Sequence, residues 1–308
     1  MTDVDLFHRA SLVRNRMRAQ RLSAEGSFLF EEVGNRLADR LLDVQRPFPV
    51  TLDLSGRPGF SKLLAKSGAI KARKMDMIVA TADAPEMARG GLLVASSQEI
   101  LPFADACADL AVSVMAMHWA NDLPGVLAQI RRTLRPDGLF LAAFLGGDTL
   151  IELRECLAAA EIEVSGGISP RVIPFVDIRD AGGLLERAGF SLPVADRDQI
   201  DTTYASVIAL MLDLRAMGET NALVQRRRHF SSRTLFVRAG ELYAERYGRE
   251  GRIPATFDVT YLAGWAPHAS QQKPLRPGSA KTRLATALDA DEQSAGEKAG
   301  PMGSKKIP

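Results

Sequence analysis

The chain has 308 residues, a formal net charge of +2 and a hydrophobic fraction of 46%. This length fits one large α/β domain or one domain with an insertion, and the small net charge excludes a protein whose overall charge would drive nucleic-acid binding. The two cysteines, Cys107 and Cys156, have no metal-ligand spacing and are too few for a disulfide framework, so we expect no metal site and a reducing, cytoplasmic location.

Residues 1–45 are predicted to form helices that precede the main domain. Apolar residues recur at helical spacing in two stretches, 6–17 and 29–41. Arg14, Arg16, Arg18 and Arg21 follow one another closely at the end of the first stretch and just after it. These can face an acidic partner, although a solvated helix face is the simpler interpretation. We expect no signal peptide, because the start lacks an apolar core, and no membrane span, because every apolar run is too short.

Strand and helix patterns alternate through residues 46–270, which we expect to form the main domain. The predicted strands are Val50–Leu54, Met75–Ala82, Leu92–Ala95, Asp109–Met115 and Leu139–Leu145. The predicted helices between and after them are Phe60–Lys66, Asp122–Leu134 and Asp148–Ile162, the last with Asp148 or Thr149 near its N-cap. A turn is expected at 135–138, where the sequence is RPDG. Alternating strands and helices predict right-handed crossovers and a mainly parallel sheet.

The second half of this region carries an interruption of the strand–helix rhythm. A helix is predicted at 177–190, closed by Gly189, and a strand follows near Leu192. Two helices at 203–217 and 233–247 then precede a last strand at 255–265. The helical insertion, about 200–250, is therefore expected to cap a ligand crevice at the strand ends. Residues 273–308 are rich in Pro, Gly, Ser and mixed charges and are predicted to be disordered.

The stretch VTLDLSGRPG, residues 50–59, has the pattern of a strand running into a ligand-holding loop. Ligands of open parallel sheets bind beyond the carboxyl ends of the strands, where glycines let backbone N–H groups approach them. Asp53 comes one residue before the end of the predicted strand. It either braces the loop through the loop's amides or contacts the ligand.

Three further residues are candidates for the same crevice, and each has two interpretations. Asp83 closes the second strand and either accepts hydrogen bonds from a ribose diol or caps a helix that opens at Pro85. His118 follows the fourth strand and is either a general base or a structural hydrogen-bonding group. Tyr204 is expected to open the first insertion helix, where it either takes a proton from an acceptor or is a buried aromatic residue.

Four stretches together resemble the seven-stranded class I S-adenosylmethionine-dependent methyltransferases, over roughly residues 28–265. They are VTLDLSGRPG, EILPFADACADLAVSVMAMHW, LAQIRRTLRPDGLFLAAF and GGLLERAGF. The resemblance implies a Rossmann-like sheet that is mainly parallel with an antiparallel last strand. Combined with the patterns above, it implies N-terminal helices and a helical cap inserted before that strand. S-adenosylmethionine is the cofactor that it implies.

Other stretches are similar to a narrower family. They are HWANDLPG, LGGDTLIELR, DIRDAGGLLERAGF, DLRAMGETNAL and GWAPHASQQKPLRPGSA. That family contains the mitochondrial complex I assembly factor that hydroxylates an arginine on the quinone-site subunit, with its alphaproteobacterial relatives. This similarity implies a protein substrate of that kind, beside a small-molecule acceptor. The insertion also resembles that of the malonyl-acyl-carrier-protein methyltransferase of biotin synthesis.

The glycine loop of the superfamily has the form D-x-G-x-G-x-G, and this chain departs from it. Asp53 and Gly59 match, Ser55 and Arg57 replace the first and second glycines, and Gly56 is out of phase. The guanidinium of Arg57 either pairs with the carboxylate of S-adenosylmethionine or fills the space that the methionine moiety needs.

The resemblance also implies cofactor contacts beyond the glycine loop. The acidic residue of the second strand usually stands one position before Asp83, and the residue that faces the adenine amine falls at Ser97. The implied cofactor-binding set is Asp53, Ser55, Gly56, Arg57, Gly59, Asp83, Glu99, Ile100, Leu101 and His118.

Three functions are open from the sequence. The first is methyl transfer, an in-line displacement that needs positioning and a water-excluded pocket more than a base; a malonyl-acyl-carrier-protein methyltransferase is one variant. The second is arginine hydroxylation, which needs a redox carrier, although the four scattered histidines make no two-His-one-carboxylate spacing. The third is a non-catalytic assembly factor, which the lost glycines favour. The basic run at 225–229 either gives the insertion a face for an acidic partner or is a solvated helix surface.

Overall fold

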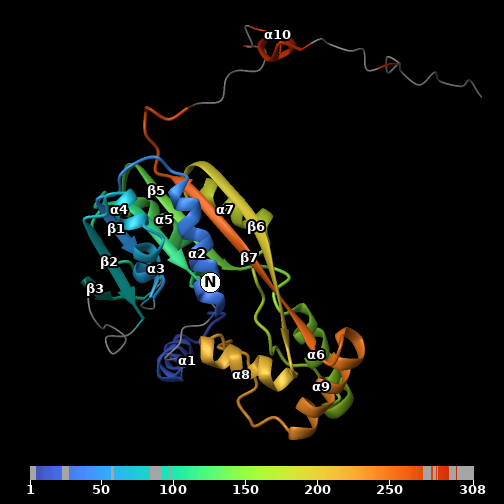
Figure 1. Cartoon of the computed structure of the whole chain (residues 1–308). Helices are drawn as coiled ribbons and strands as arrows, with labels where there is room; N and C mark the ends of the chain where they lie inside the picture. The colour runs from blue at the N-terminus through green and yellow to red at the C-terminus, as the bar shows by residue number, and fades with distance from the viewer. Residues whose placement is uncertain are drawn as a thin grey trace, which may run out of the picture. The chain divides into compact units, whose positions relative to one another are not determined.

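The structure is a computed structural model of the chain that describes residues 5–22, 28–56, 59–83, 92–97, 99–272, 279, 282, 284–290 and 296 (Figure 1). The chain divides into two compact units, Met1–Ala269 and Ser270–Pro308. The helices of the first unit are α1 Arg9–Leu22, α2 Phe28–Leu42, α3 Phe60–Lys66, α4 Ala69–Ala72, α5 Leu123–Thr133, α6 Ile151–Ser165, α7 Ile178–Arg187, α8 Val207–Met217 and α9 Arg233–Tyr247, with a 3₁₀ turn, η2, at Met117–Trp119. Its strands are β1 Val50–Asp53, β2 Met77–Ala82, β3 Leu92–Ala95, β4 Ala108–Val114, β5 Leu134–Leu145, β6 Ser191–Tyr204 and β7 Ile253–Trp265.

One seven-stranded sheet forms the centre of the first unit, in the order β3-β2-β1-β4-β5-β7-β6. Strands β1 to β5 pair in parallel. Strand β7 pairs antiparallel to both β5 and β6, so it is the one strand of the described sheet that runs against the rest. This confirms the predicted Rossmann-like sheet with an antiparallel last strand. The order places β1 and β4 side by side at the switch point, where open sheets of this kind bind ligands.

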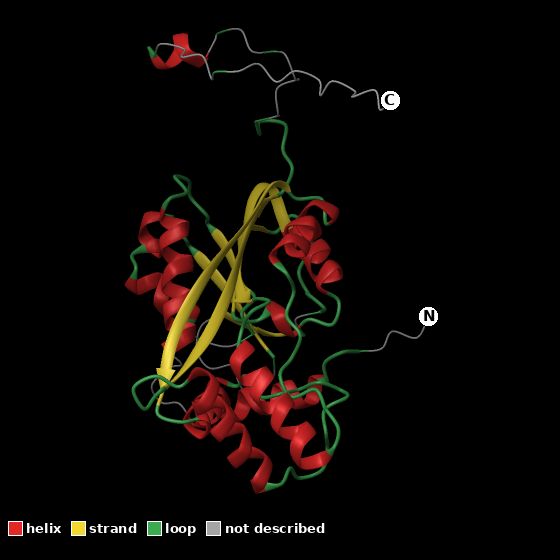
Figure 2. Ribbon diagram, turned by 90° about the vertical axis from the view of Figure 1, so that its right-hand side faces the viewer, coloured by secondary structure: helices red, strands yellow, loops and turns green. Residues whose placement is uncertain are grey.

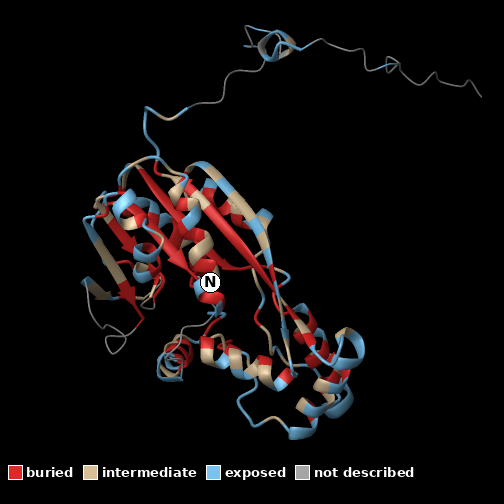
Figure 3. Cartoon of the chain, viewed as in Figure 1, coloured by how far each residue is buried: buried red, intermediate tan, exposed pale blue. Residues whose placement is uncertain are grey.

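The core lies on both faces of the sheet, as the apolar run of β5 predicts. Leu139, Leu141 and Ala143 pack into the cluster that includes α2, α3, α6, α8 and α9, whereas Phe140 and Phe144 pack with α5 and α7. Successive strand residues point to opposite faces, so an unbroken apolar run requires cover on both sides. Figure 2 shows helices on both sides of the strands, and Figure 3 shows the central strands β1, β4, β5 and β7 as largely buried.

The helical insertion lies between β6 and β7, as predicted, and consists of α8 and α9. Helix α9 packs against α6, and α8 packs against α1 (Figure 1). Both insertion helices are capped by serine hydroxyls: Ser206 accepts from the N–H of Ala209, and Ser232 from that of Leu235. The N-terminal helix and the insertion therefore meet, although nearly 200 residues separate them in the sequence.

Three local predictions are wrong. The RPDG turn is not a separate turn, because β5 already begins at Leu134 and carries 135–138 as an irregularity in its pairing with β4, with Asp137 at a φ of 64°. Helix α6 begins at Ile151, three residues after the predicted start at Asp148, with Leu150 at its N-cap and no side-chain cap. The hydroxyl of Thr149 donates instead to the carbonyl of Asp258 in β7. Tyr204 does not open a helix; it ends β6.

The second unit carries one short helix, α10 Leu284–Leu288, within the stretch predicted to be disordered. Its sequence, LATAL, consists of residues that accept helical geometry, four of the five being leucine or alanine. Among the described residues of the whole chain, no helix combines the length and the apolar character that crossing a membrane requires.

Candidate functional site at the carboxyl edge of the sheet

Asp53 ends β1 and is buried at the switch point. Its carboxylate accepts hydrogen bonds from the backbone N–H of Ser55 at 3.0 Å and from the Ser55 hydroxyl at 2.6 Å. Burial raises the pKa of Asp53 to about 6, and the bonds from Ser55 act in the opposite direction. The same hydroxyl accepts from the N–H of Val114 in β4 at 3.0 Å. Asp53 therefore has the bracing role that was one of its two predicted interpretations, and Ser55, at the first glycine position, completes the brace.

The loop after Asp53 passes through Gly56, which has a φ of +68°. A Cβ at this position would lie 2.9 Å from Arg16 Nη1 and 2.9 Å from Asp83 Oδ1, so only glycine allows these charged groups to approach the backbone. Gly59, with a φ of +135°, stands at the N-cap of α3 and faces Phe30. Arg57, the residue with two predicted roles, lies outside the described residues, as does Pro58.

Asp83 follows β2 and faces the same loop, since its N–H donates to the carbonyl of Gly56. Its carboxylate forms an ion pair with Arg16 of α1, and the two side chains are 0% and 2% exposed. The second oxygen of Asp83, Oδ1, has no hydrogen-bond partner among the described residues. The predicted alternative, a cap for a helix at Pro85, falls on residues outside those described.

The segment after β3 holds three of the predicted cofactor-binding residues, Glu99, Ile100 and Leu101. Glu99 accepts from the N–H of Asn121 at 2.6 Å, and its carbonyl accepts from Gln129 of α5. Leu101 is buried, whereas Ile100 is 70% exposed. Within the described protein, Glu99 therefore ties this segment to the loop after β4.

His118 and Trp119 follow β4 and share one acceptor. His118 Nε2 lies 2.9 Å from Glu219 Oε2, and Trp119 Nε1 donates to the same oxygen at 2.8 Å. Glu219 comes from the loop that follows α8, and its side chain is 4% exposed. Because a carboxylate only accepts, Nε2 of His118 carries the hydrogen of this contact. The contact engages one of the two ring nitrogens of His118.

A cavity of about 440 Å³ opens beside this cluster. Its floor is formed by Trp119 and by Leu145 at the end of β5, and its walls come from α6, the connection to α7, α8, the 219–227 loop and α9. The walls are apolar, but arginines and one acidic residue also line it: Arg171, Arg215, Arg226, Arg227 and Glu219. The insertion thus roofs a chamber at the carboxyl edge of β4 and β5, as predicted for a cap.

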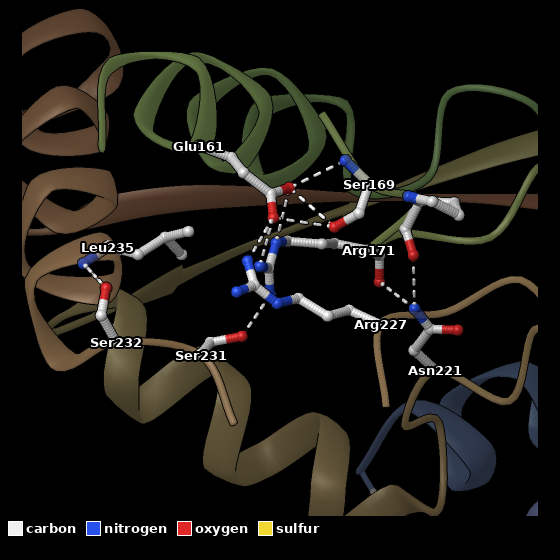
Figure 4. A network of polar contacts seen from close by, with 9 residues as sticks. Glu161, Ser169, Arg171, Asn221, Arg227, Ser231, Ser232 and Leu235 are labelled. Atoms are coloured by element: carbon white, nitrogen blue, oxygen red, sulfur yellow. Dashed lines mark hydrogen bonds and ion pairs between the residues drawn. The ribbon is translucent and has the colours of Figure 1, made fainter. Parts of the chain in front are cut away.

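A polar network closes one side of the cavity (Figure 4). Glu161 of α6 accepts from Arg171 Nη2 at 2.6 Å and from the backbone and hydroxyl of Ser169, and Arg227 lies 3.6 Å away. Arg171 also donates to Ser231 Oγ at 3.0 Å, which joins the network to the residues before α9. The guanidinium of Arg171 lowers the pKa of Glu161 to about 2.

Tyr204 lies away from this cluster. Its hydroxyl donates to Asp213 of α8 at 2.7 Å, and it is half-buried at the end of β6. Burial, with that carboxylate as a second cause, raises its pKa. No residue set among those described groups three or more metal-binding side chains.

Sequence reasoning did not identify Arg16 or Glu219 as residues of the site. Arg16 is one of five arginines in the first helix, and only the fold shows that it points inward. Glu219 lies 100 residues after Trp119, so no local spacing connects the two. Arg16 at least had a signal, because it continues the apolar face of α1 with Leu12 and Ala19 and is buried with them.

The described residues fit an adenosyl ligand at this edge. Asp83 presents a carboxylate oxygen without a partner among them, Gly56 exposes backbone where a side chain is excluded, and the buried Leu101 supplies apolar surface. An acidic group at the end of the second strand suits a ribose diol, because both hydroxyls can donate to it.

Comparison with known proteins gives the same family. Residues 55–142 match the methyltransferase domain family. The chain is 40% identical over 277 residues to the mitochondrial arginine-hydroxylase NDUFAF5 of Danio rerio, covering 85% of this chain and 83% of that protein. It is 42% identical over 256 residues to the Homo sapiens protein of the same name, covering 82% and 74%. A malonyl-[acyl-carrier protein] O-methyltransferase of Laribacter hongkongensis is 36% identical over 270 residues, covering 81% and 86%.

The sheet order, the glycine-loop geometry and these identities agree with one another. S-adenosylmethionine is the cofactor of this class of domain. The chain belongs to the class I S-adenosylmethionine-dependent methyltransferase superfamily and, within it, to the family of the arginine-hydroxylase NDUFAF5 proteins.

Proposed function

We propose that the protein is a methyltransferase that modifies a protein or small-molecule acceptor held in the cavity under the insertion. The observation that carries this proposal is the position of the cavity. Trp119 and Leu145, which line the cavity, belong to the same carboxyl edge as Asp53 and Asp83, two of the proposed cofactor-binding residues. An acceptor in the cavity is therefore adjacent to the cofactor crevice.

When bound, S-adenosylmethionine supplies a methyl group activated by a sulfonium. The protein then has to orient the acceptor and exclude water, and the apolar walls from Leu153, Leu157 and Phe236 suit that task. A base is not required for an acceptor that is already nucleophilic.

The polar lining favours an acceptor with an anionic group. Four arginines and one acidic residue, Glu219, line the cavity. A second acidic residue, Glu161, lies beside it and pairs with Arg171. A carboxylate oxygen can take a methyl group without losing a proton. The similarity to a malonyl-[acyl-carrier protein] O-methyltransferase supports this variant of the proposal.

A second candidate is arginine hydroxylation in the assembly of an NADH:quinone oxidoreductase, with the quinone-site subunit as the protein substrate. It is supported by the 42% identity to a protein named arginine-hydroxylase and by Glu219, whose carboxylate can pair with a guanidinium. A non-catalytic role in the same assembly is the third candidate. The cytoplasmic location stays a prediction, and the names of the NDUFAF5 relatives include the word mitochondrial.

Intact-mass spectra of the quinone-site subunit, from cells with and without this gene, separate these candidates. A subunit that lacks a methyl group in the deletion strain supports methyl transfer to a protein. One that lacks an oxygen atom supports hydroxylation and contradicts the leading proposal for this acceptor. An unchanged mass, together with a loss of assembled complex, supports the non-catalytic role. Complementation with the wild-type gene is the control.

A further inference from the structure

Arg16 occupies the part of the edge that the cofactor needs. Its guanidinium pairs with the carboxylate of Asp83, and both side chains are buried. Its Nη1 also lies 2.9 Å from the place where a Cβ of Gly56 would stand. A ribose diol would donate hydrogen bonds to Asp83, and the cofactor would approach the backbone of Gly56. The guanidinium of Arg16 lies next to both Asp83 and Gly56.

Helix α1 holds Arg16 in this position from several sides. Val13 and Met17 pack against Ala82, the last residue of β2. On the opposite side, the Cα of Arg16 comes within 3.5 Å of the Cβ position of Gly218, and Asn15 donates to the carbonyl of Thr220 at 2.9 Å. These contacts anchor the backbone of α1 between the sheet and the insertion, while the guanidinium stays at the end of a flexible side chain.

A buried ion pair resists separation. Removing one partner leaves a buried charge without its counterion, and this is strongly unfavourable. A neutral ligand that took Asp83 would therefore leave the Arg16 guanidinium uncompensated. S-adenosylmethionine differs from such a ligand because its methionine moiety carries a carboxylate, which can replace Asp83 as the counterion through charge-assisted hydrogen bonds.

We propose that Arg16 is the carboxylate-binding residue of the cofactor site. In the ligand-free protein it holds Asp83, and in the complex it leaves Asp83 to the ribose hydroxyls and pairs with the carboxylate of the cofactor. The exchange leaves Arg16 paired with a carboxylate in both end states, while Asp83 exchanges its ion pair for hydrogen bonds from the ribose hydroxyls. It also makes the carboxylate a condition for tight binding, so the site discriminates against adenosyl compounds that lack it. This inference rests on the proposed use of S-adenosylmethionine.

Calorimetric titration with two ligands tests the exchange. The probes are S-adenosylmethionine and decarboxylated S-adenosylmethionine, which lacks only the carboxylate. The wild type is expected to prefer the first by roughly tenfold to a hundredfold, the range for a hydrogen bond to a charged group. In Arg16→Gln the preference is expected to fall to near unity, because binding of S-adenosylmethionine weakens while binding of the decarboxylated ligand strengthens. Arg14→Gln, on the exposed side of the same helix, is expected to keep the wild-type preference.

The remaining outcomes overturn the inference in distinguishable ways. If Arg16→Gln weakens both ligands by one factor, Arg16 is only structural; if it strengthens both, Arg16 is only an obstruction. Arg16→Lys retains the charge and guards against misfolding of the glutamine variant: a preference that stays well above unity supports the exchange, and a preference near unity contradicts it. A folded wild-type protein that binds neither ligand removes the proposed cofactor, and the inference with it.

Discussion

Asp53 has an acidic side chain that is completely buried. Burial and the hydrogen bonds from Ser55 have opposite effects on its pKa and therefore on stability. Burial raises its pKa to about 6, whereas Ser55 donates two hydrogen bonds to it. The unfolded carboxyl group has a pKa of 3.8. As the pH rises through the window between these values, the unfolded chain releases its proton before the folded one, so this residue lowers stability above pH 6.

Asp53→Asn should remove that pH dependence. Asparagine keeps an acceptor for Ser55 but carries no charge, so the wild type should lose about 2–3 kcal/mol relative to the variant between pH 4 and pH 7. Denaturant unfolding at the two pH values measures the difference. Asp39→Asn, at an exposed position of α2, controls for the loss of one carboxylate. Parallel pH profiles of Asp53→Asn and the wild type would show that Asp53 ionises normally in the fold.

At the scale of elements, one carboxylate connects three segments around the cavity. Glu161 lies on α6, Arg171 and Ser169 lie on the connection to α7, and Arg227 and Ser231 lie on the connection between α8 and α9. The side chain of Glu161 is 3% exposed. Its low pKa means that it stabilises the fold above pH 4.5, the unfolded value, and that this stabilisation disappears as the pH falls toward 2.

Glu161→Gln should therefore loosen the wall of the cavity. At pH 7 we expect a loss of about 2–3 kcal/mol in the free energy of unfolding, because the partly buried guanidinium of Arg171 loses its counterion. The difference from wild type should shrink at pH 3, where the carboxyl group of the unfolded wild type is already mostly protonated. Glu163→Gln is the matched control, since Glu163 lies on the same helix and pairs with Arg238 at an exposed position. An equal effect of the two substitutions would exclude a special role for Glu161.

At the scale of the whole molecule, the N-terminal helix and the insertion form one boundary of the site. The N–H of His8 donates to the carbonyl of Ala222, that of Val224 donates to the carbonyl of Leu6, and Phe7 packs edge-on against Trp119 at 5.2 Å. The loop with Glu219 is thus attached to the segment that carries Arg16. Movement of α1 during cofactor exchange would reach the acceptor cavity through these contacts.

The core of the described residues lies entirely within the first unit, since the last buried residue is Ala266. A chain of residues 1–272 should therefore unfold at the same temperature as the full chain and keep its affinity for S-adenosylmethionine. Thermal denaturation with and without the cofactor tests this, with the full chain as the reference. A drop of several degrees would indicate that residues 273–308 contribute to the stability of the first unit.

The amino-acid sequence by itself determined the sheet and the order of its elements. Strand and helix periods, the double-faced apolar run of β5 and the interruption at 200–250 are local patterns, and local patterns survive in a single sequence. They also placed Asp53 and Asp83 at the strand ends. The cap of α6 and the start of α8 were misplaced, because Thr149 and Tyr204 bond to distant or following segments, Asp258 and Asp213, that outcompete the local signals.

Only the tertiary structure decided which charges meet. Arg16 and Asp83 are 67 residues apart, and His118 and Glu219 are 101 apart, so neither pair has a spacing that a sequence pattern records. Burial selects these pairs, since a charge removed from water must find a counterion wherever the fold supplies one. Helix α1 carries five arginines, and the sequence gives only a weak signal that one of them is buried. The packing of that helix against β2 and α8 directs Arg16 alone into the buried pair with Asp83.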